Sequence, residues 1–361
     1  MSDSDHSSRR RFLQGTTVAA SSLFGVGQVY GKNIGQPDEI DIPVVVSGDK
    51  VVETATVPFK WWQHEQRVIR LQEQLVDRLG DTPGIVSVGV GTQSSTIGGK
   101  KVSHLRVGRD SEADISTNMP TRVDGIPVEV HSPEKTELHS CDDSWDDTNT
   151  YDPVEGGVRL DGSHSSCCAV RYTNDDGEIL NCLMTDGHSY DCSFESIDDT
   201  VEQEGQKIGE IEEIRPAQDW AIIRLTNDAD ISFFSNNIAG SSPKASGYVS
   251  QHGLHQLKSN DTKVFNRGAK TTLTNGTITG YDKQLPYTSG CEGSNDYENY
   301  VRLTTCTFGG DSGSIHYHEY TNYRGDKRAA VIAPHKGGGD DYSVGCAAYR
   351  IRESNDIEFG E

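Results

Sequence analysis

Gly309-Gly310-Asp311-Ser312-Gly313-Ser314 is a glycine-rich loop that carries a serine, and it is the strongest indication of the fold. Two shorter motifs precede it along the chain. Leu183-Met184-Thr185-Asp186-Gly187-His188 is typical of a strand that ends on a glycine–histidine turn, and Asp219 stands directly before the apolar run Trp220-Ala221-Ile222-Ile223. A histidine, an aspartate and a serine therefore follow one another along the chain, each at the edge of an expected strand.

These three residue types suit acyl transfer. A serine hydroxyl is a weak nucleophile at neutral pH and needs a base within hydrogen-bonding distance. A histidine such as His188 can take that proton and return it to a leaving group, and Asp219 would hold the imidazole in one tautomer. The N–H groups of Gly310 and Ser312 are the expected oxyanion donors, each worth about 2.7–4 kcal/mol. The order of motifs predicts His188, Asp219 and Ser312 as a catalytic triad.

The motifs, and much of residues 157–361, resemble the chymotrypsin-like serine peptidases, in particular the bacterial streptogrisin and α-lytic branch. The segments Lys263–Thr272 and Gly276–Gly280 resemble a glycine–threonine hairpin of that branch. The resemblance implies a mainly β fold with a double six-stranded β-barrel, acting on protein or peptide substrates without a cofactor or metal ion. In this family, Asp311 is expected to pair with a buried cation or a new N-terminus.

The sequence departs from that family beside the histidine. Asp186 and Ser189 stand where the family has alanine and cysteine. An acid at position 186 either raises the pKa of His188 or faces the solvent. Ser314 replaces a glycine, but glutamyl endopeptidases share this form.

The specificity pocket is expected at His335, Lys336, Gly337 and Gly338, which resemble the family's pocket strand. In glutamyl endopeptidases a histidine in the place of His335 binds the substrate carboxylate, and an inward-turned Lys336 would add positive charge. The resemblance therefore allows a preference for acidic P1 residues. Side chains that point to solvent would instead leave a small-apolar or aromatic preference.

The sequence holds eight cysteines, which in an exported chain are expected to form disulfides. The resemblance pairs Cys306 with Cys346, and Cys192 with Cys168 or Cys167. The histidines at 252, 255, 316 and 318 lack further ligands at tetrahedral spacing, so no metal site is expected.

The charge balance excludes several function classes. Fifty-five acidic residues against 33 basic ones give a net charge of −22, which would repel nucleic acids and anionic lipid. Acidic residues scattered along the whole chain indicate a surface adapted to a salt-rich medium. In such a medium the Debye length falls to about 3 Å, so the surface charges no longer repel one another strongly. We expect a halophilic, monomeric protein.

Residues 1–31 resemble a twin-arginine export signal. Ser8-Arg9-Arg10-Arg11-Phe12-Leu13 is followed by a short apolar stretch, and no later stretch is long enough to span a membrane. We therefore expect a secreted or cell-surface protein.

Three segments follow the signal region. Residues 60–132 predict a small α+β domain with a helix over 61–79, which would serve as a pro-segment that assists folding, an inhibitory plug or an accessory domain. Residues 133–156 form an acidic linker with a plausible processing site. From 157 to 361, short β runs with glycine turns predict the trypsin-like peptidase domain.

These observations predict an exported halophilic serine endopeptidase. One alternative is a catalytically silent or autoinhibited trypsin-fold binding protein of the cell surface, favoured by the altered residues at 186 and 189. The other is an esterase that uses the same three residues.

Overall fold

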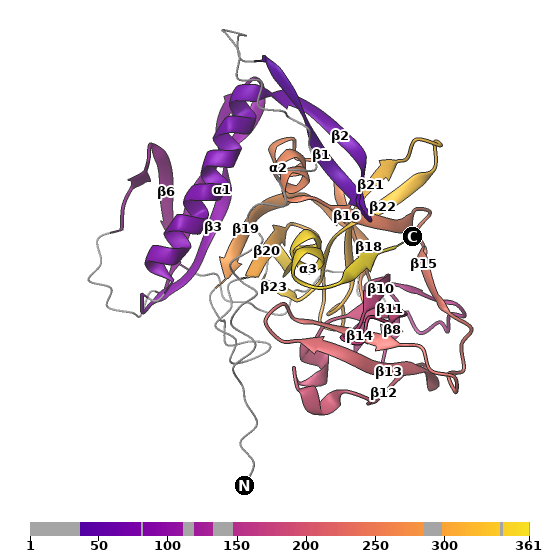
Figure 1. Cartoon of the computed structure of the whole chain (residues 1–361). Helices are drawn as coiled ribbons and strands as arrows, with labels where there is room; N and C mark the ends of the chain where they lie inside the picture. Colours follow the sequence, from indigo (N-terminus) through magenta and orange to yellow (C-terminus); the bar gives the residue numbers. More distant parts are fainter. Residues whose placement is uncertain are drawn as a thin grey trace. The chain divides into compact units, whose positions relative to one another are not determined.

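The computed structural model describes residues 37–80, 82–110, 119–132, 147–284, 298–339 and 342–360. The predicted export signal and residues 133–146 of the predicted linker lie outside these ranges. Residues Asp38–Glu361 form one compact unit, in which strands far outnumber helices (Figure 1). The mainly β prediction is confirmed.

A six-stranded antiparallel sheet carries the histidine and the aspartate. Its order is β12-β13-β14-β11-β10-β25. Its strands are β10 (Ala169–Thr173), β11 (Ile179–Thr185), β12 (Thr200–Gln203), β13 (Gln206–Arg215), β14 (Trp220–Arg224) and β25 (Ile357–Phe359). Apolar side chains at alternating positions fill its inner face, including Ile211 and Ile223. Because Thr185 at the end of β11 pairs with Ala221 near the start of β14, the residues just beyond these two strand ends become neighbours.

A second sheet carries the serine loop. Its path runs β18-β17-β21-β22-β16-β1-β2, through β18 (Thr272–Gly276), β17 (Val264–Gly268), β21 (Ile315–Thr321), β22 (Lys327–Pro334), β16 (Lys244–Val249), β1 (Glu39–Ser47) and β2 (Lys50–Pro58). Ile315 pairs with Pro334, so the loop before β21 and the segment after β22 leave the sheet side by side. That register brings Ser312 next to His335.

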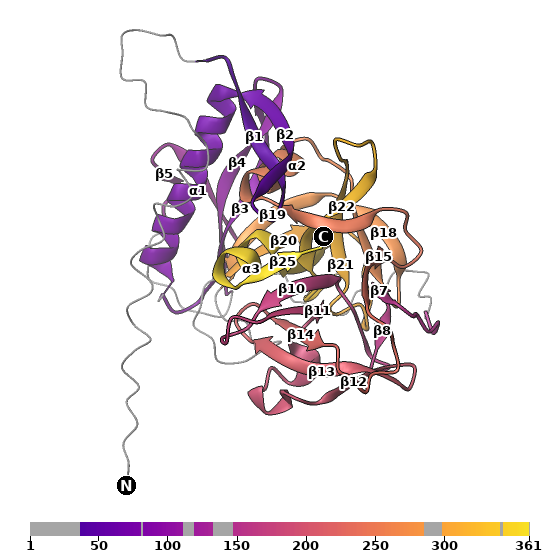
Figure 2. The same ribbon diagram turned by 45° about the vertical axis from the view of Figure 1, so that its right-hand side comes forward.

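The third sheet joins the predicted N-terminal segment to the predicted peptidase segment. Its order is β23-β24-β20-β19-β3-β4-β6-β5. The strands are β23 (Gly337–Gly339), β24 (Tyr342–Cys346), β20 (Glu298–Leu303), β19 (Ile278–Gln284), β3 (Ile85–Ile97), β4 (Lys100–Arg109), β6 (Ile126–His131) and β5 (Arg122–Val123). The predicted helix is present as α1 (Phe59–Leu79), and its apolar face packs on β3 and β4 (Figure 2). The seam is the β3–β19 pairing, in which Val90 lies opposite Tyr281.

The remaining elements are short. They are β7 (Val154–Gly156), β8 (Arg159–Leu160), β9 (His164–Ser165), β15 (Phe234–Ile238), α2 (Gln251–Ser259), α3 (Ala348–Ser354) and the 3₁₀ turns η1 (His188–Tyr190) and η2 (Phe194–Ser196). Within the described ranges, no helix combines the length and the apolar character that a membrane crossing requires.

Both predicted disulfide pairings are wrong. Cys192 and Cys306 each take part in a disulfide bond. Their predicted partners Cys168 and Cys346 are buried free thiols, and so are Cys167 and Cys182. The sheet registers place these four thiols inside one apolar core cluster, where cysteine behaves as a small hydrophobic residue.

Candidate active site

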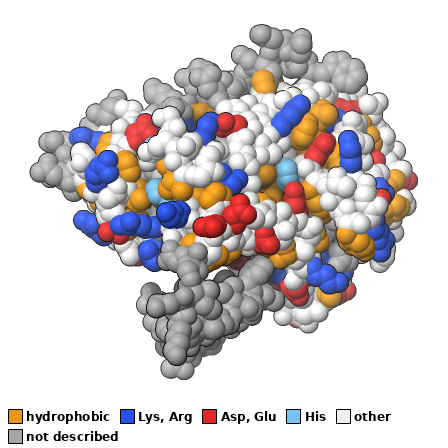
Figure 3. Space-filling model, turned by 90° about the horizontal axis from the view of Figure 1, so that it is seen from above, with side chains coloured by type: hydrophobic (Ala, Val, Ile, Leu, Met, Phe, Trp, Pro, Cys, Tyr) orange, Lys and Arg blue, Asp and Glu red, His pale blue; other side chains and the backbone are white. Residues whose placement is uncertain are grey.

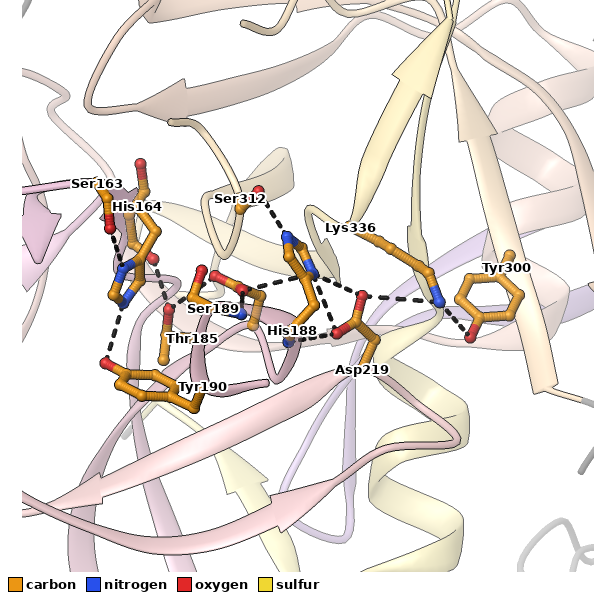
Figure 4. A network of polar contacts seen from close by, with 12 residues as sticks. Ser163, His164, Thr185, His188, Ser189, Tyr190, Asp219, Tyr300, Ser312 and Lys336 are labelled. Carbon is orange, nitrogen blue, oxygen red and sulfur yellow. Dashed lines mark hydrogen bonds and ion pairs between the residues drawn. The ribbon is translucent and has the colours of Figure 1, made fainter. Parts of the chain in front are cut away.

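The three residues of the predicted triad lie in one line of contacts. His188 Nε2 lies 2.9 Å from Ser312 Oγ. On the other side of the ring, His188 Nδ1 lies 3.0 Å from Asp219 Oδ2, and the His188 backbone N–H donates to Asp219 Oδ1 at 2.8 Å. Figure 4 shows this line running from Ser312 through His188 to Asp219. The imidazole is therefore held by its ring and by its backbone.

Local backbone geometry makes this approach possible. Asp219 has a left-handed φ of 55° and ends a tight turn, in which its N–H donates to Pro216 O at 3.3 Å. A Cβ added at Gly187 would lie 3.2 Å from Trp220 O. Glycine at 187 therefore lets the histidine turn pack closely against the start of β14.

The serine loop presents two backbone donors. Gly310 has a φ of 107°, a conformation that favours glycine. Ser165 N–H donates to Ser312 O at 2.7 Å, which fixes the nucleophile's backbone. Among the described residues, nothing accepts a hydrogen bond from the N–H of Gly310 or Ser312. Both donors remain available for an oxyanion.

The expectation for Asp311 needs a correction. Its fully buried carboxylate pairs with no cation within the described residues, while the expected pairing with a new N-terminus stays a prediction. It accepts from the N–H groups of Lys270 (2.8 Å), Thr271 (3.2 Å) and Phe308 (2.9 Å), and from the Thr271 hydroxyl (2.7 Å). Burial raises the pKa of Asp311 although these donors oppose the shift. Hydrogen bonds from backbone N–H groups and from the Thr271 hydroxyl thus stabilise the Asp311 carboxylate in place of the expected cation.

The nearby cation has another partner. Arg267 forms a buried ion pair with Asp147, which lies inside the predicted linker. The described part of the linker is therefore attached to the body of the molecule, and its last three residues form β7, which pairs with β15.

Two further charged groups lie beside the His188–Asp219 contact. The Asp186 carboxylate is buried, with Oδ2 at 3.4 Å from His188 Nδ1, so it does not face the solvent. Lys336 Nζ lies 3.7 Å from Asp219 Oδ2. Burial lowers the pKa of His188, but the hydrogen bond and charge of Asp219, together with the charge of Asp186, outweigh burial and raise it to about 9. Burial opposes ionisation of Asp219, yet contact with His188 and the charge of Lys336 hold its pKa below the usual range.

The predicted pocket residues divide into two groups. His335 is 3% exposed, and its Nδ1 lies 3.2 Å from His316 Nε2. Gly337 and Gly338 form β23, whose hairpin needs glycine because a Cβ at 338 would lie 2.2 Å from Tyr342 O. Lys336 turns toward the triad, where its ammonium group lies 3.7 Å from Asp219 Oδ2 and 3.3 Å from the Tyr300 hydroxyl, and its role as a pocket residue stays a prediction.

His316 and Tyr300 were not predicted as site residues. His316 follows Ser312 by four residues on β21, opposite Ala333 in β22, and this register was the available signal. Within the described residues, no group of three or more His, Cys, Asp or Glu side chains is arranged to hold a metal ion.

No protein-family model matches the chain, and no curated protein matches it. Solved structures do match. A glutamic acid-specific serine protease, which utilises a novel histidine triad in substrate binding, is 19% identical over 57% of this chain and 99% of its own, with a TM-score of 0.38. Thermobifida fusca protease A is 18% identical over 57% of this chain and 97% of its own, with a TM-score of 0.37. Cellulomonas bogoriensis chymotrypsin is 17% identical over 58% and 98%, with a TM-score of 0.39.

Proposed function

We propose that the protein is a serine endopeptidase that hydrolyses peptide bonds through an acyl-Ser312 intermediate. The observation that carries this proposal is the line of contacts from Ser312 Oγ through His188 to Asp219, beside the available N–H groups of Gly310 and Ser312. A nucleophile, a base, an orienting acid and oxyanion donors are the parts that acyl transfer needs.

The proposed reaction has two halves. Ser312 Oγ attacks the peptide carbonyl while His188 Nε2 takes the hydroxyl proton, and the new oxyanion accepts from the two backbone N–H groups. His188 then gives that proton to the leaving amine as the C–N bond breaks. Water enters, loses a proton to His188 and attacks the ester, and Ser312 regains its proton.

The edge strand β23 would hold the substrate backbone. β23 ends its sheet in the described residues, and it begins two residues after His335. An exposed strand edge can pair with an extended peptide. A substrate bound in this way would run directly past Ser312, because Gly313 N–H donates to His335 O at 2.8 Å.

We propose a preference for acidic P1 residues. A buried chain of polar contacts supports it: His335 Nδ1 to His316 Nε2 at 3.2 Å, and His316 Nδ1 to Thr305 Oγ1 at 3.3 Å. Burial lowers the pKa of His316 to about 3, so this ring is neutral. When its hydrogen lies on Nε2, it is donated to His335 Nδ1, and His335 Nε2 carries an N–H that suits a carboxylate.

We also propose export by the twin-arginine route and adaptation to high salt. The motif at residues 8–13 and the net charge of −22 support these two proposals. Residues 60–132 would then act as an accessory domain that remains part of the peptidase, since β3 pairs with β19.

The peptidase proposal is tested with Ser312→Ala and His188→Ala, assayed on unfolded protein substrates in molar salt. Each variant should lose at least a thousandfold in kcat/KM, since the nucleophile and base act as a unit. Ser189→Ala is the matched control, because this hydroxyl is exposed and outside the contact line. Hydrolysis that survives in Ser312→Ala would contradict the proposal, and an inactive wild-type protein would favour the binding-protein alternative.

The acidic preference is tested with His335→Ala on matched peptides with Glu or Leu at P1. The variant should reduce kcat/KM for the Glu peptide by at least tenfold more than for the Leu peptide, because only the former loses a charge-assisted hydrogen bond. Equal losses for the two peptides would dismiss the preference.

A further inference from the structure

The base of the triad touches charges that its chemistry does not require. Besides Asp219, the Asp186 carboxylate approaches His188 Nδ1, and Lys336 approaches Asp219 Oδ2, the same oxygen that contacts His188 Nδ1. Figure 4 shows Lys336 reaching Asp219 from the side opposite His188. Two anions and one cation thus act on a single imidazole.

The cation is held in place. Lys336 N–H donates to Val344 O at 2.8 Å, which fixes its backbone in the β23–β24 hairpin. Its ammonium group lies 3.3 Å from Tyr300 Oη and 4.9 Å from the centroid of the Tyr300 ring. Tyr300 in turn donates to Ala217 O at 2.9 Å, in the turn that leads to Asp219. One tyrosine thus positions the lysine and contacts the turn of the acid that the lysine approaches.

The second anion is held as firmly. Asp186 is fully buried, and its Oδ2 accepts from the Ser189 N–H at 2.8 Å. The Thr185 hydroxyl contacts Oδ1 at 3.3 Å. A buried carboxylate beside an imidazole favours the imidazolium form, and a nearby half-buried ammonium group opposes it.

The other titratable groups near the base are mutually bonded. His164 Nε2 lies 3.0 Å from Tyr190 Oη, and Tyr190 donates to Asp161 Oδ2 at 3.1 Å. Burial lowers the pKa of His164, while Asp186 and Asp161 act to raise it and His188 to lower it.

We propose that Lys336 and Asp186 are opposed positioning residues that set the fraction of His188 in the neutral, proton-accepting form. This inference rests on the proposed peptidase function. Asp186 stabilises the imidazolium that forms during acyl transfer. Lys336 reduces the stabilisation of the imidazolium by the two carboxylates, so that the resting His188 can still release its proton. Neither residue touches the reacting atoms.

The test uses charge-removing variants that keep side-chain size: Lys336→Met, Asp186→Asn and the double variant. Lys336→Met should move the acid limb of the kcat/KM profile to higher pH and reduce kcat/KM at least fivefold on that limb. The alkaline plateau should change little. Asp186→Asn should move the limb to lower pH, and the double variant should return it toward the wild type. Lys336→Arg should keep the wild-type limb.

Lys207→Met is the control for general loss of charge, because Lys207 pairs with Glu210 and Asp228. A merely structural role predicts equal losses at every pH, or shifts of the same sign in both single variants, and either result would overturn the proposal. A second readout is the ¹⁵N-imidazole titration of His188 in the Ser312→Ala background. It measures the same shifts without turnover, so failure of the inference is distinguishable from failure of the peptidase proposal.

Discussion

The protonation of one imidazole controls the proposed chemistry. Burial alone would keep His188 neutral, but contact with Asp219 and the charge of Asp186 raise its pKa to about 9. Only the neutral ring can accept the Ser312 proton. At neutral pH most of the resting protein therefore carries an inactive imidazolium.

This pKa predicts an alkaline pH optimum. Below about pH 9, kcat/KM should rise roughly tenfold per pH unit, because the neutral fraction of His188 rises by that factor. The measurement is kcat/KM of the wild-type protein from pH 6 to 10.5 at constant salt. A plateau already reached at pH 7 would show that His188 keeps an ordinary pKa.

At the residue scale, the order of the three motifs predicts the triad, but it does not predict which side chains surround the triad. His188, Asp219 and Ser312 each stand at a strand edge, so their convergence follows from strand pairing. The direction of Lys336 does not follow, because it depends on Tyr300 in a different strand. The Asp311 partners likewise come from the Lys270–Thr271 hairpin.

At the element scale, a buried polar cluster joins α1 to α2, β4 and β19. Glu65 on α1 accepts from Ser103 N–H at 3.0 Å and contacts His255 Nδ1. Lys258 donates to Ser103 Oγ at 2.6 Å. Burial opposes ionisation of Glu65, but His255 and Lys258 lower its pKa to about 2, while burial lowers the pKa of Lys258 to about 8. The buried carboxylate of Glu65 thus connects α1 to β4 and α2.

Glu65→Gln should destabilise the fold by about 3–5 kcal/mol, since it leaves a buried cation without its counter-charge. The measurement is denaturant unfolding in high salt, with Glu73→Gln as the control on the exposed side of α1. Because the folded pKa of Glu65 is depressed, its contribution is present above about pH 4.5 and is lost as the pH falls toward 2. The two unfolding curves should therefore converge in acid, and equal stability of the two variants at pH 7 would contradict this account of the seam.

The helix over 61–79 and the strand after it follow from apolar periodicity. The pairing of β1 with β16 does not, since the two strands lie about 200 residues apart along the chain. Long-range pairing leaves no local pattern, so neither this pairing nor that of β3 with β19 could be predicted from the sequence.

At the scale of the whole molecule, charge is spread rather than concentrated. Acidic and basic side chains both occur across the face in Figure 3, while the total remains −22. Self-repulsion of that size destabilises the compact state at low ionic strength.

The folded state should therefore loosen below about 1 M salt, where screening is incomplete. The measurement is the Tm of the wild-type protein from low to multimolar salt, with a neutral osmolyte as the control for solvent exclusion. A Tm that does not depend on salt would contradict the prediction that the protein is adapted to high salt.

We expect the intact chain to hold an assembled nucleophile, base and oxyanion site. The most direct measurement is labelling of the full-length protein by a fluorophosphonate in molar salt, followed by mass spectrometry of the labelled peptide. Ser312 should take the label in the wild-type protein and in Ser189→Ala, but not in His188→Ala. An intact wild-type protein that takes no label on Ser312 would contradict this expectation.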